Sequence, residues 1–84
     1  MIVAAAIKLT DDDLYVGNLE DRHCDVISRI RKEGIKLPIL QDNQGFVTDE
    51  GQFLRRGAAG AHAMKSGQIT KLKFPPNLYS EDLW

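Results

Sequence analysis

The chain has 84 residues, of which 43% are hydrophobic and 27% are charged, with 11 Lys and Arg side chains against 12 Asp and Glu. This composition excludes a disordered tail, and no apolar run is long enough to cross a membrane, so one globular domain over residues 1–84 is predicted. A net charge of −1 argues against a general nucleic-acid-binding protein, which needs an excess of Lys and Arg. The single cysteine, Cys24, excludes an intramolecular disulfide and favours the cytoplasm.

Two β-hairpins are predicted. Residues 2–9 form the first strand, residues 10–13 a polar turn, and residues 14–16 a short returning strand. The second hairpin covers residues 45–53, where Gly51 would supply the positive φ of a bulged turn. Residues 69–74 alternate basic and apolar side chains and are expected to form a last strand.

Two helices are predicted between and after these strands. The first covers residues 19–33, opened by the spacing of Asn18 and Asp21 and ended by Gly34. The second covers residues 54–66, an alanine-rich stretch in which Gly57 and Gly60 each weaken the helix by about 1 kcal/mol relative to Ala. Such small residues would let the helix approach a neighbouring segment closely.

These elements predict an α+β fold, in which a small antiparallel sheet of two hairpins is packed by two helices on one face. Residues 75–84 form a predicted C-terminal tail that packs on the domain or on a partner, because an exposed Trp84 would leave a large apolar surface in water. Ser80 would cap a single helical turn within this tail.

The densest polar group lies at the start of the first helix. Arg22, Asp25 and Arg29 stand three and four residues apart, so one carboxylate would hold two guanidinium groups that grip a phosphate or a partner's carboxylate. The alternative is a solvated helix face. His23 lies in the middle of the apolar face of this helix, either as a hydrogen-bonded core histidine or as a titrating residue of a site.

Arg55 and Arg56 stand at the opening of the second helix, where cations oppose the helix dipole unless an anion lies among them. An anion-binding helix start is one hypothesis, and arginines that merely cover apolar surface are the other. No phosphate-binding loop, nucleophile elbow or zinc spacing is found, so no cofactor or metal is expected. The candidate ligand- or partner-binding residues are Arg22, His23, Asp25, Arg29, Arg55, Arg56, Tyr79, Glu81, Asp82 and Trp84.

Four segments together resemble a family of small proteins encoded in tailed bacteriophages and prophages, whose biochemical role is unassigned. They are Arg22-His23-x-Asp25-Val26-Ile27, Gln44-Gly45-Phe46-Val47-Thr48-x-x-Gly51-x-Phe53-Leu54-x-Arg56, Ser66-Gly67-Gln68-Ile69 and Leu78-Tyr79-Ser80-Glu81-Asp82-Leu83-Trp84. The resemblance runs from the first strand to the last residue and implies a phage accessory protein.

The small size, near-neutral charge and lack of a complete catalytic set favour a binding protein over an enzyme. The first hypothesis is a phage protein that binds a host or phage protein in the host cytoplasm and inhibits a host enzyme or anti-phage defence system. The second is a binder of a small anionic molecule, a phosphorylated ligand or nucleotide, through Arg22, His23, Arg29 and Arg56. A homodimer is a further option, because a domain of this size has a thin stability margin.

Overall fold

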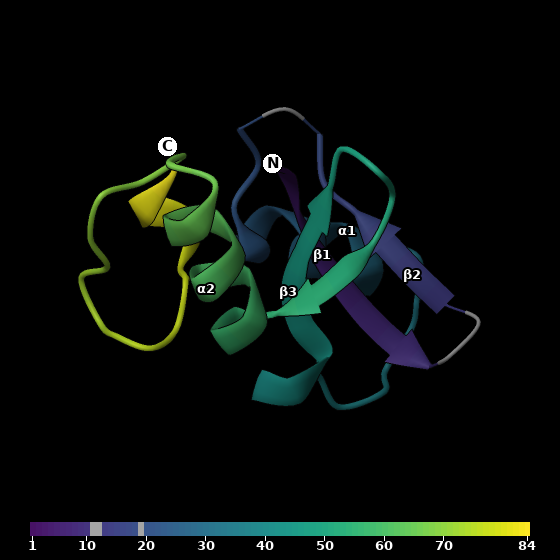
Figure 1. Cartoon of the computed structure of the whole chain (residues 1–84). Coiled ribbons are helices and arrows are strands. Elements are labelled where there is room, and N and C mark those ends of the chain that lie inside the picture. Colours follow the sequence, from purple (N-terminus) through teal and green to yellow (C-terminus); the bar gives the residue numbers. More distant parts are fainter. Residues whose placement is uncertain (11–12, 19) are drawn as a thin grey trace.

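The computed structural model describes residues 1–10, 13–18 and 20–84 (Figure 1). The regular elements are β1 (Ile2–Thr10), β2 (Asp13–Val16), α1 (His23–Lys32), β3 (Gln44–Thr48), β4 (Phe53–Arg55) and α2 (Arg56–Lys65), with 3₁₀ turns η1 (Gln41–Asn43) and η2 (Ser80–Asp82). The four strands form one antiparallel sheet in the order β2-β1-β3-β4, built from two hairpins. The predicted α+β fold is therefore confirmed.

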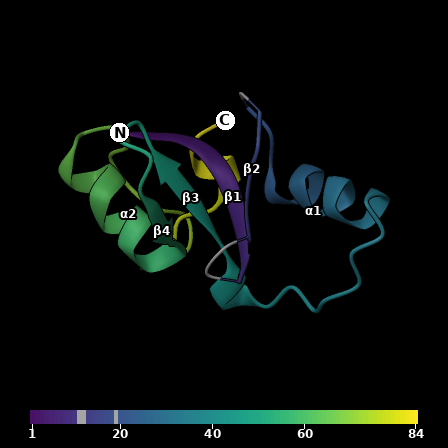
Figure 2. The ribbon, with the colours of Figure 1, turned by 90° about the vertical axis from the view of Figure 1, so that its right-hand side faces the viewer.

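Both helices pack on the same face of the sheet. Ala5 and Ile7 of β1 stand two residues apart, so their side chains point to the same side. Ala5 belongs to a core cluster with Ala59 of α2, whereas Ile7 belongs to a cluster with Val26 and Ile30 of α1. Figure 2 shows the strands side by side, with α2 next to the β4 end, α1 next to the β2 end and the C-terminal turn between the helices.

The first helix begins later than predicted. Its predicted start, Leu19, lies outside the described residues, and Glu20 has a φ of 66°, in the left-handed region that a helix cannot pass through. The Asn18 and Asp21 pair does close a turn, since the Asn18 N–H donates to Asp21 Oδ2 at 2.9 Å. The turn precedes the helix, and α1 itself starts at His23.

The second helix and the last strand also differ from the prediction. Leu54 and Arg55 belong to β4, paired with Phe46 and Gly45 of β3, so α2 starts only at Arg56. Residues 69–74 form no strand, and only an isolated bridge between Phe74 and Asn77 is found there. The apolar residues of this segment, Ile69 and Leu72, instead pack against the α2 cluster, which satisfies their burial without strand pairing.

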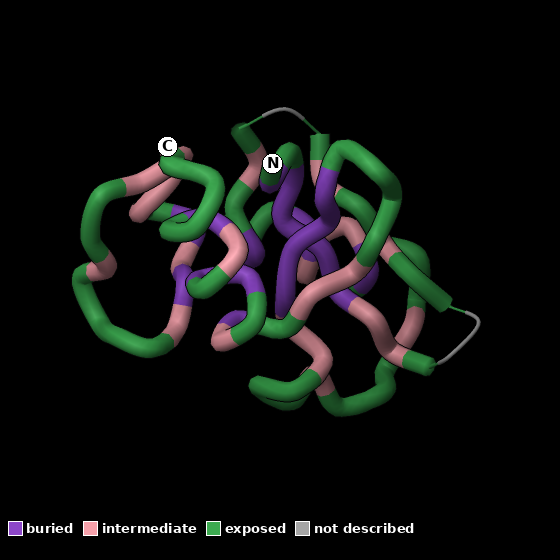
Figure 3. The backbone as a smooth tube through the Cα atoms, viewed as in Figure 1, coloured by how far each residue is buried: buried purple, intermediate pink, exposed green. Residues whose placement is uncertain are grey.

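The C-terminal tail packs on the domain rather than extending from it. Leu78 is fully buried in the same core cluster as Phe46 and Ala59, and Figure 3 shows this buried stretch of the tail beside α2. A Cβ added to Gly60 of α2 would lie 2.7 Å from the carbonyl oxygen of Pro76. Glycine is needed at this position because the tail backbone passes directly over the helix.

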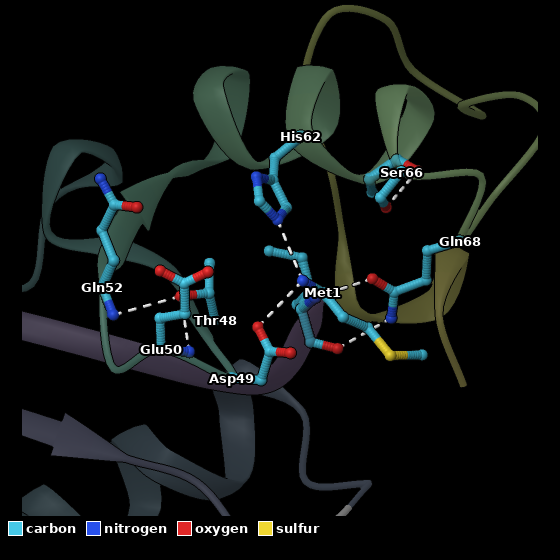
Figure 4. A network of polar contacts seen from close by, with 10 residues as sticks. Met1, Thr48, Asp49, Glu50, Gln52, His62, Ser66 and Gln68 are labelled. Atoms are coloured by element: carbon cyan, nitrogen blue, oxygen red, sulfur yellow. Dashed lines mark hydrogen bonds and ion pairs between the residues drawn. The ribbon is translucent and has the colours of Figure 1, made fainter.

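The start of β1 is held between the β3–β4 hairpin and α2 (Figure 4). The Met1 ammonium lies 3.1 Å from Asp49 Oδ1 in the hairpin and 3.1 Å from His62 Nε2 on α2. The Gln68 side chain accepts from the Ile2 N–H at 2.7 Å and donates to the Ile2 carbonyl at 2.8 Å. One amide side chain thus pairs the β1 backbone as a neighbouring strand would.

Candidate functional site

Arg22, His23 and Arg56 line one hollow, although they come from two stretches far apart in sequence. Its volume is about 250 Å³, and its remaining lining residues are Cys24, Tyr79, Ser80 and Glu81. The hollow lies where the start of α1, the start of α2 and the η2 turn meet. Of the ten candidate residues, the hollow is lined by Arg22, His23, Arg56, Tyr79 and Glu81, and their role depends on what each polar group already contacts.

Both ring nitrogens of His23 are engaged within the domain. Nε2 lies 2.7 Å from the carbonyl oxygen of Gly45, which can only accept, so Nε2 carries the proton. Nδ1 lies 2.8 Å from Ser80 Oγ and therefore accepts from the hydroxyl. Burial lowers the pKa of His23 to about 4, the Gly45 contact opposes this shift, and the positive charge of Arg56 adds to it. His23 is thus neutral and joins α1, β3 and η2.

Arg22, which lines the hollow, also contacts the C-terminal residue Trp84. Arg22 Nη2 donates to the main-chain oxygen of Trp84 at 2.9 Å, and Arg22 Nη1 lies 3.8 Å from Glu81 Oε2. The Trp84 indole N–H donates to the Asp21 carbonyl at 3.0 Å. The aromatic end of the chain is therefore anchored to the segment that precedes α1.

The predicted fork of two arginines on Asp25 is wrong. Asp25 Oδ2 accepts from the Arg22 backbone N–H at 2.9 Å, because a carboxylate in the first turn caps the helix. Arg29 pairs with Asp21 at 3.0 Å, outside the hollow. Asp82 is also a capping residue, accepting from the Tyr79 N–H at 2.9 Å, so Tyr79 and not Ser80 is the N-cap of the 3₁₀ turn.

Arg56 is a buried cation, with only 8% of its surface exposed. Nη1 donates to the Leu78 carbonyl at 3.0 Å and Nη2 to Gln44 Oε1 at 2.7 Å, while Nε has no hydrogen-bond partner. The guanidinium lies 4.4 Å from the centre of the Tyr79 ring. Desolvation lowers the pKa of Arg56, and Tyr79 and Glu81 act in the opposite direction. Sequence reasoning did not single out Gln44 as a site residue, because an uncharged amide gives no signal for such a contact.

Arg55 does not line this hollow. It lines a second one, of about 380 Å³, at the start of α2, whose other lining residues are Gln41, Asp42, Arg56, Gly57, Ala58 and Asn77. The two adjacent arginines therefore serve different surroundings: Arg56 is shared by both hollows, and Arg55 is exposed at the edge of the second.

A further surface, which sequence reasoning missed, is the sheet face opposite the helices. We call it the open sheet face. Cross-strand pairing places on one side of the sheet the residues Ala4, Ala6, Leu14, Val16, Val47 and Phe53. Leu14 and Val16 are 40% and 42% exposed, Phe53 is half-buried, and Ala4, Ala6 and Val47 are buried, while the helices and the tail pack on the other side. Successive side chains of a strand point to opposite faces, so Leu14 and Val16 share one face and Tyr15 lies on the other. This alternation was the sequence signal for an apolar side chain on each face of the sheet.

The geometry defines a small α+β domain whose polar groups are largely hydrogen-bonded within the fold and whose sheet exposes the apolar Leu14 and Val16 of β2 on the side away from the helices. The chain belongs to the phage T4 y16D protein family, whose model matches residues 1–84. No curated protein sequence and no solved structure matches it. None of the helices in the described part of the chain has the length and apolarity needed to cross a membrane. The expected kinship with small phage proteins is thus confirmed.

Proposed function

We propose that this protein is a phage accessory protein that binds a partner protein in the host cytoplasm through its open sheet face. The observation that carries the proposal is the exposure of Leu14 and Val16 on the edge strand β2, on a face that neither helix covers. Large apolar side chains gathered and exposed on one face of a small domain are typical of a protein interaction site. A host enzyme or anti-phage defence protein would be inhibited when this domain covers its working surface.

The charges around the open sheet face favour an acidic partner. Lys8 pairs across the sheet with Leu14, and Arg55 follows Phe53 by two residues, so both cations border the apolar residues. Within the described segments, neither cation forms an ion pair. A second copy of the chain would bring the same cations to the same interface, whereas a partner with an apolar centre and an acidic rim complements them.

The hollow of Arg22, His23 and Arg56 supports a phosphorylated ligand less well. His23 is neutral and uses both nitrogens within the domain, and Arg22 is engaged by Trp84 and Glu81. An anion would have to displace these contacts and would meet the Glu81 carboxylate. These contacts support a structural role for the hollow, in which its residues hold the C-terminal tail on the domain.

A photo-crosslinking experiment tests the proposed interface. A photoreactive phenylalanine analogue is placed at Val16, and at Leu37 as the control, since Leu37 is 50% exposed and lies outside the open sheet face. In host lysate, we expect the analogue at position 16 to give one discrete adduct that is absent from position 37. An adduct of twice the monomer mass would identify a second copy and contradict the proposal.

The partner protein that the crosslink identifies is then purified, and its affinity for this protein and for matched variants is measured by titration. We expect Val16→Glu to weaken the complex at least about tenfold, because it buries a charge against apolar surface, whereas Leu37→Glu leaves the affinity unchanged. Equal effects of the two variants, or no complex between the purified proteins, would overturn the proposal. Circular dichroism of both variants checks that the fold is kept.

A further inference from the structure

The start of α2 is an uncapped helix end. In the part of the chain that the structure describes, no side chain accepts from its first N–H groups, and its first turn contains no acidic residue. Instead its N-cap is Arg55 and its first residue is Arg56, and both place positive charge beside the positive end of the helix dipole. The N–H groups of Gly57 and Ala58 are without intrahelical partners at such an end.

An independent observation concerns the Arg56 side chain, whose charge has the Tyr79 ring 4.4 Å away but no ion-pair partner among the described residues. This side chain is more than nine-tenths buried, yet its two hydrogen-bond acceptors, the Leu78 carbonyl and the Gln44 amide oxygen, are neutral, and Nε has none. No carboxylate among the described residues lies within ion-pair distance of it. Buried charges in proteins are normally paired, so a counter-ion from outside the chain would remove a large electrostatic penalty.

The hollow at this helix start has room for more than a simple ion. It measures about 380 Å³, and it is lined by both arginines and by Gly57 and Ala58. Three further polar residues line it: Gln41, Asp42 and Asn77. Asp42 would repel a bare anion but would accept a hydrogen bond from a hydroxyl or amino group attached to one.

We propose that the hollow at the start of α2 binds a small phosphate monoester that carries hydroxyl or amino groups, such as a nucleotide or a sugar phosphate. The phosphate takes the free N–H groups of Gly57 and Ala58 and the guanidinium of Arg55, with Arg56 as a buried countercharge. Asp42 and Asn77 contact the rest of the molecule. The site shares Arg55 with the border of the open sheet face, but the Gly57 and Ala58 amides do not belong to that face, so the titration of these amides and the crosslink at Val16 can each fail alone.

An NMR titration of the ¹⁵N-labelled protein tests the site directly. Three probes are used: inorganic phosphate, adenosine monophosphate and glucose 6-phosphate. We expect saturable shifts of the Gly57 and Ala58 amide signals, with tighter binding of at least one ester than of inorganic phosphate. If no probe shifts these two signals, the site is overturned, and equal affinity for all three probes would overturn the assignment to an ester.

Matched variants separate the site from general charge effects. Arg55→Gln should weaken binding at least about tenfold, because it removes a charge-assisted hydrogen bond from an exposed residue without disturbing the core. Lys65→Gln, the same charge change at the other end of α2, should leave binding unchanged. Ala58→Glu should raise the melting temperature of the free protein and abolish ligand binding, since its carboxylate occupies the helix start. Equal weakening by Arg55→Gln and Lys65→Gln would contradict the proposal.

Discussion

His23 Nδ1 accepts a hydrogen bond from Ser80 Oγ at 2.8 Å, although 57 residues separate the two in sequence. The other ring nitrogen of His23 donates to the Gly45 carbonyl of β3. A single neutral imidazole therefore connects the first helix, the sheet and the C-terminal turn. The tail that carries Trp84 stays on the domain largely because of this connection and the burial of Leu78.

Removing the Ser80 hydroxyl should destabilise the domain. Ser80→Ala leaves His23 Nδ1 buried without a donor, which costs about 1–3 kcal/mol. The measurement is the free energy of unfolding in urea. Ser28→Ala, at an exposed position of α1, is the matched control and should change this free energy by no more than about 0.5 kcal/mol. Equal losses in the two variants would contradict a role for the His23–Ser80 contact.

Stability should fall as the solution is acidified from pH 6.5 toward pH 4. The pKa of His23 is about 4 in the folded protein and 6.5 in the unfolded chain, so between these values the unfolded chain binds the additional proton. His23 therefore contributes stability that is fully present above pH 6.5 and is lost as the pH falls, up to about 3 kcal/mol. Urea unfolding at half-unit pH steps measures this slope.

We expect this change of the unfolding free energy with pH to come from His23, and a His23 variant tests this. His23→Gln has no titrating group, so it should be less stable than the parent at pH 7 and should lose less stability between pH 6.5 and pH 4. Other groups near His23 are charged, notably Arg56 and Glu81, and they remain in both proteins. An unchanged slope in the variant would show that His23 is not the group that titrates.

Two glycine substitutions in α2 should have opposite effects. Alanine at Gly57 meets only Asn77 Oδ1 at 3.7 Å, an ordinary contact, so Gly57→Ala should stabilise the domain by up to about 1 kcal/mol. Alanine at Gly60 would lie 2.7 Å from the Pro76 carbonyl and 3.2 Å from Leu72 Cδ1. Gly60→Ala should therefore lower the melting temperature by displacing the tail. Two stabilising variants would refute the close approach of tail and helix.

The hairpins and the close approach of the tail to α2 could be predicted from the sequence, because the residues that indicate each of them lie within a few positions of one another. Gly51 has a φ of 82°, as the bulged turn required, and Gly60 allows the close approach that its size suggested. The start of the second helix was wrong because Leu54 and Arg55 pair with β3, and the start of the first was wrong because two capping signals compete in sequence. Both Asn18 with Asp21 and Arg22 with Asp25 form the same contact, and only the left-handed backbone at Glu20 decides between them.

The meeting of Arg22, His23 and Arg56 was predictable only as a hypothesis, because it depends on the path of the tail between the helices. The neutral state of His23 and the contact of Gln44 with Arg56 depend on tertiary burial, which no spacing reveals. The open sheet face could have been predicted in part from the sequence. Its residues alternate along β2, but their exposure follows from both helices packing on the other side.

Hydrogen–deuterium exchange of the purified partner complex locates the surface of the domain that the partner covers. If the open sheet face binds the partner, the amides of residues 13–16 and 53–55 should exchange more slowly in the complex, while the segment around Arg22 and Glu81 exchanges as in the free protein. Protection confined to residues 22–24 and 79–81, with β2 unchanged, would contradict the account and place the interface at the hollow between the helices.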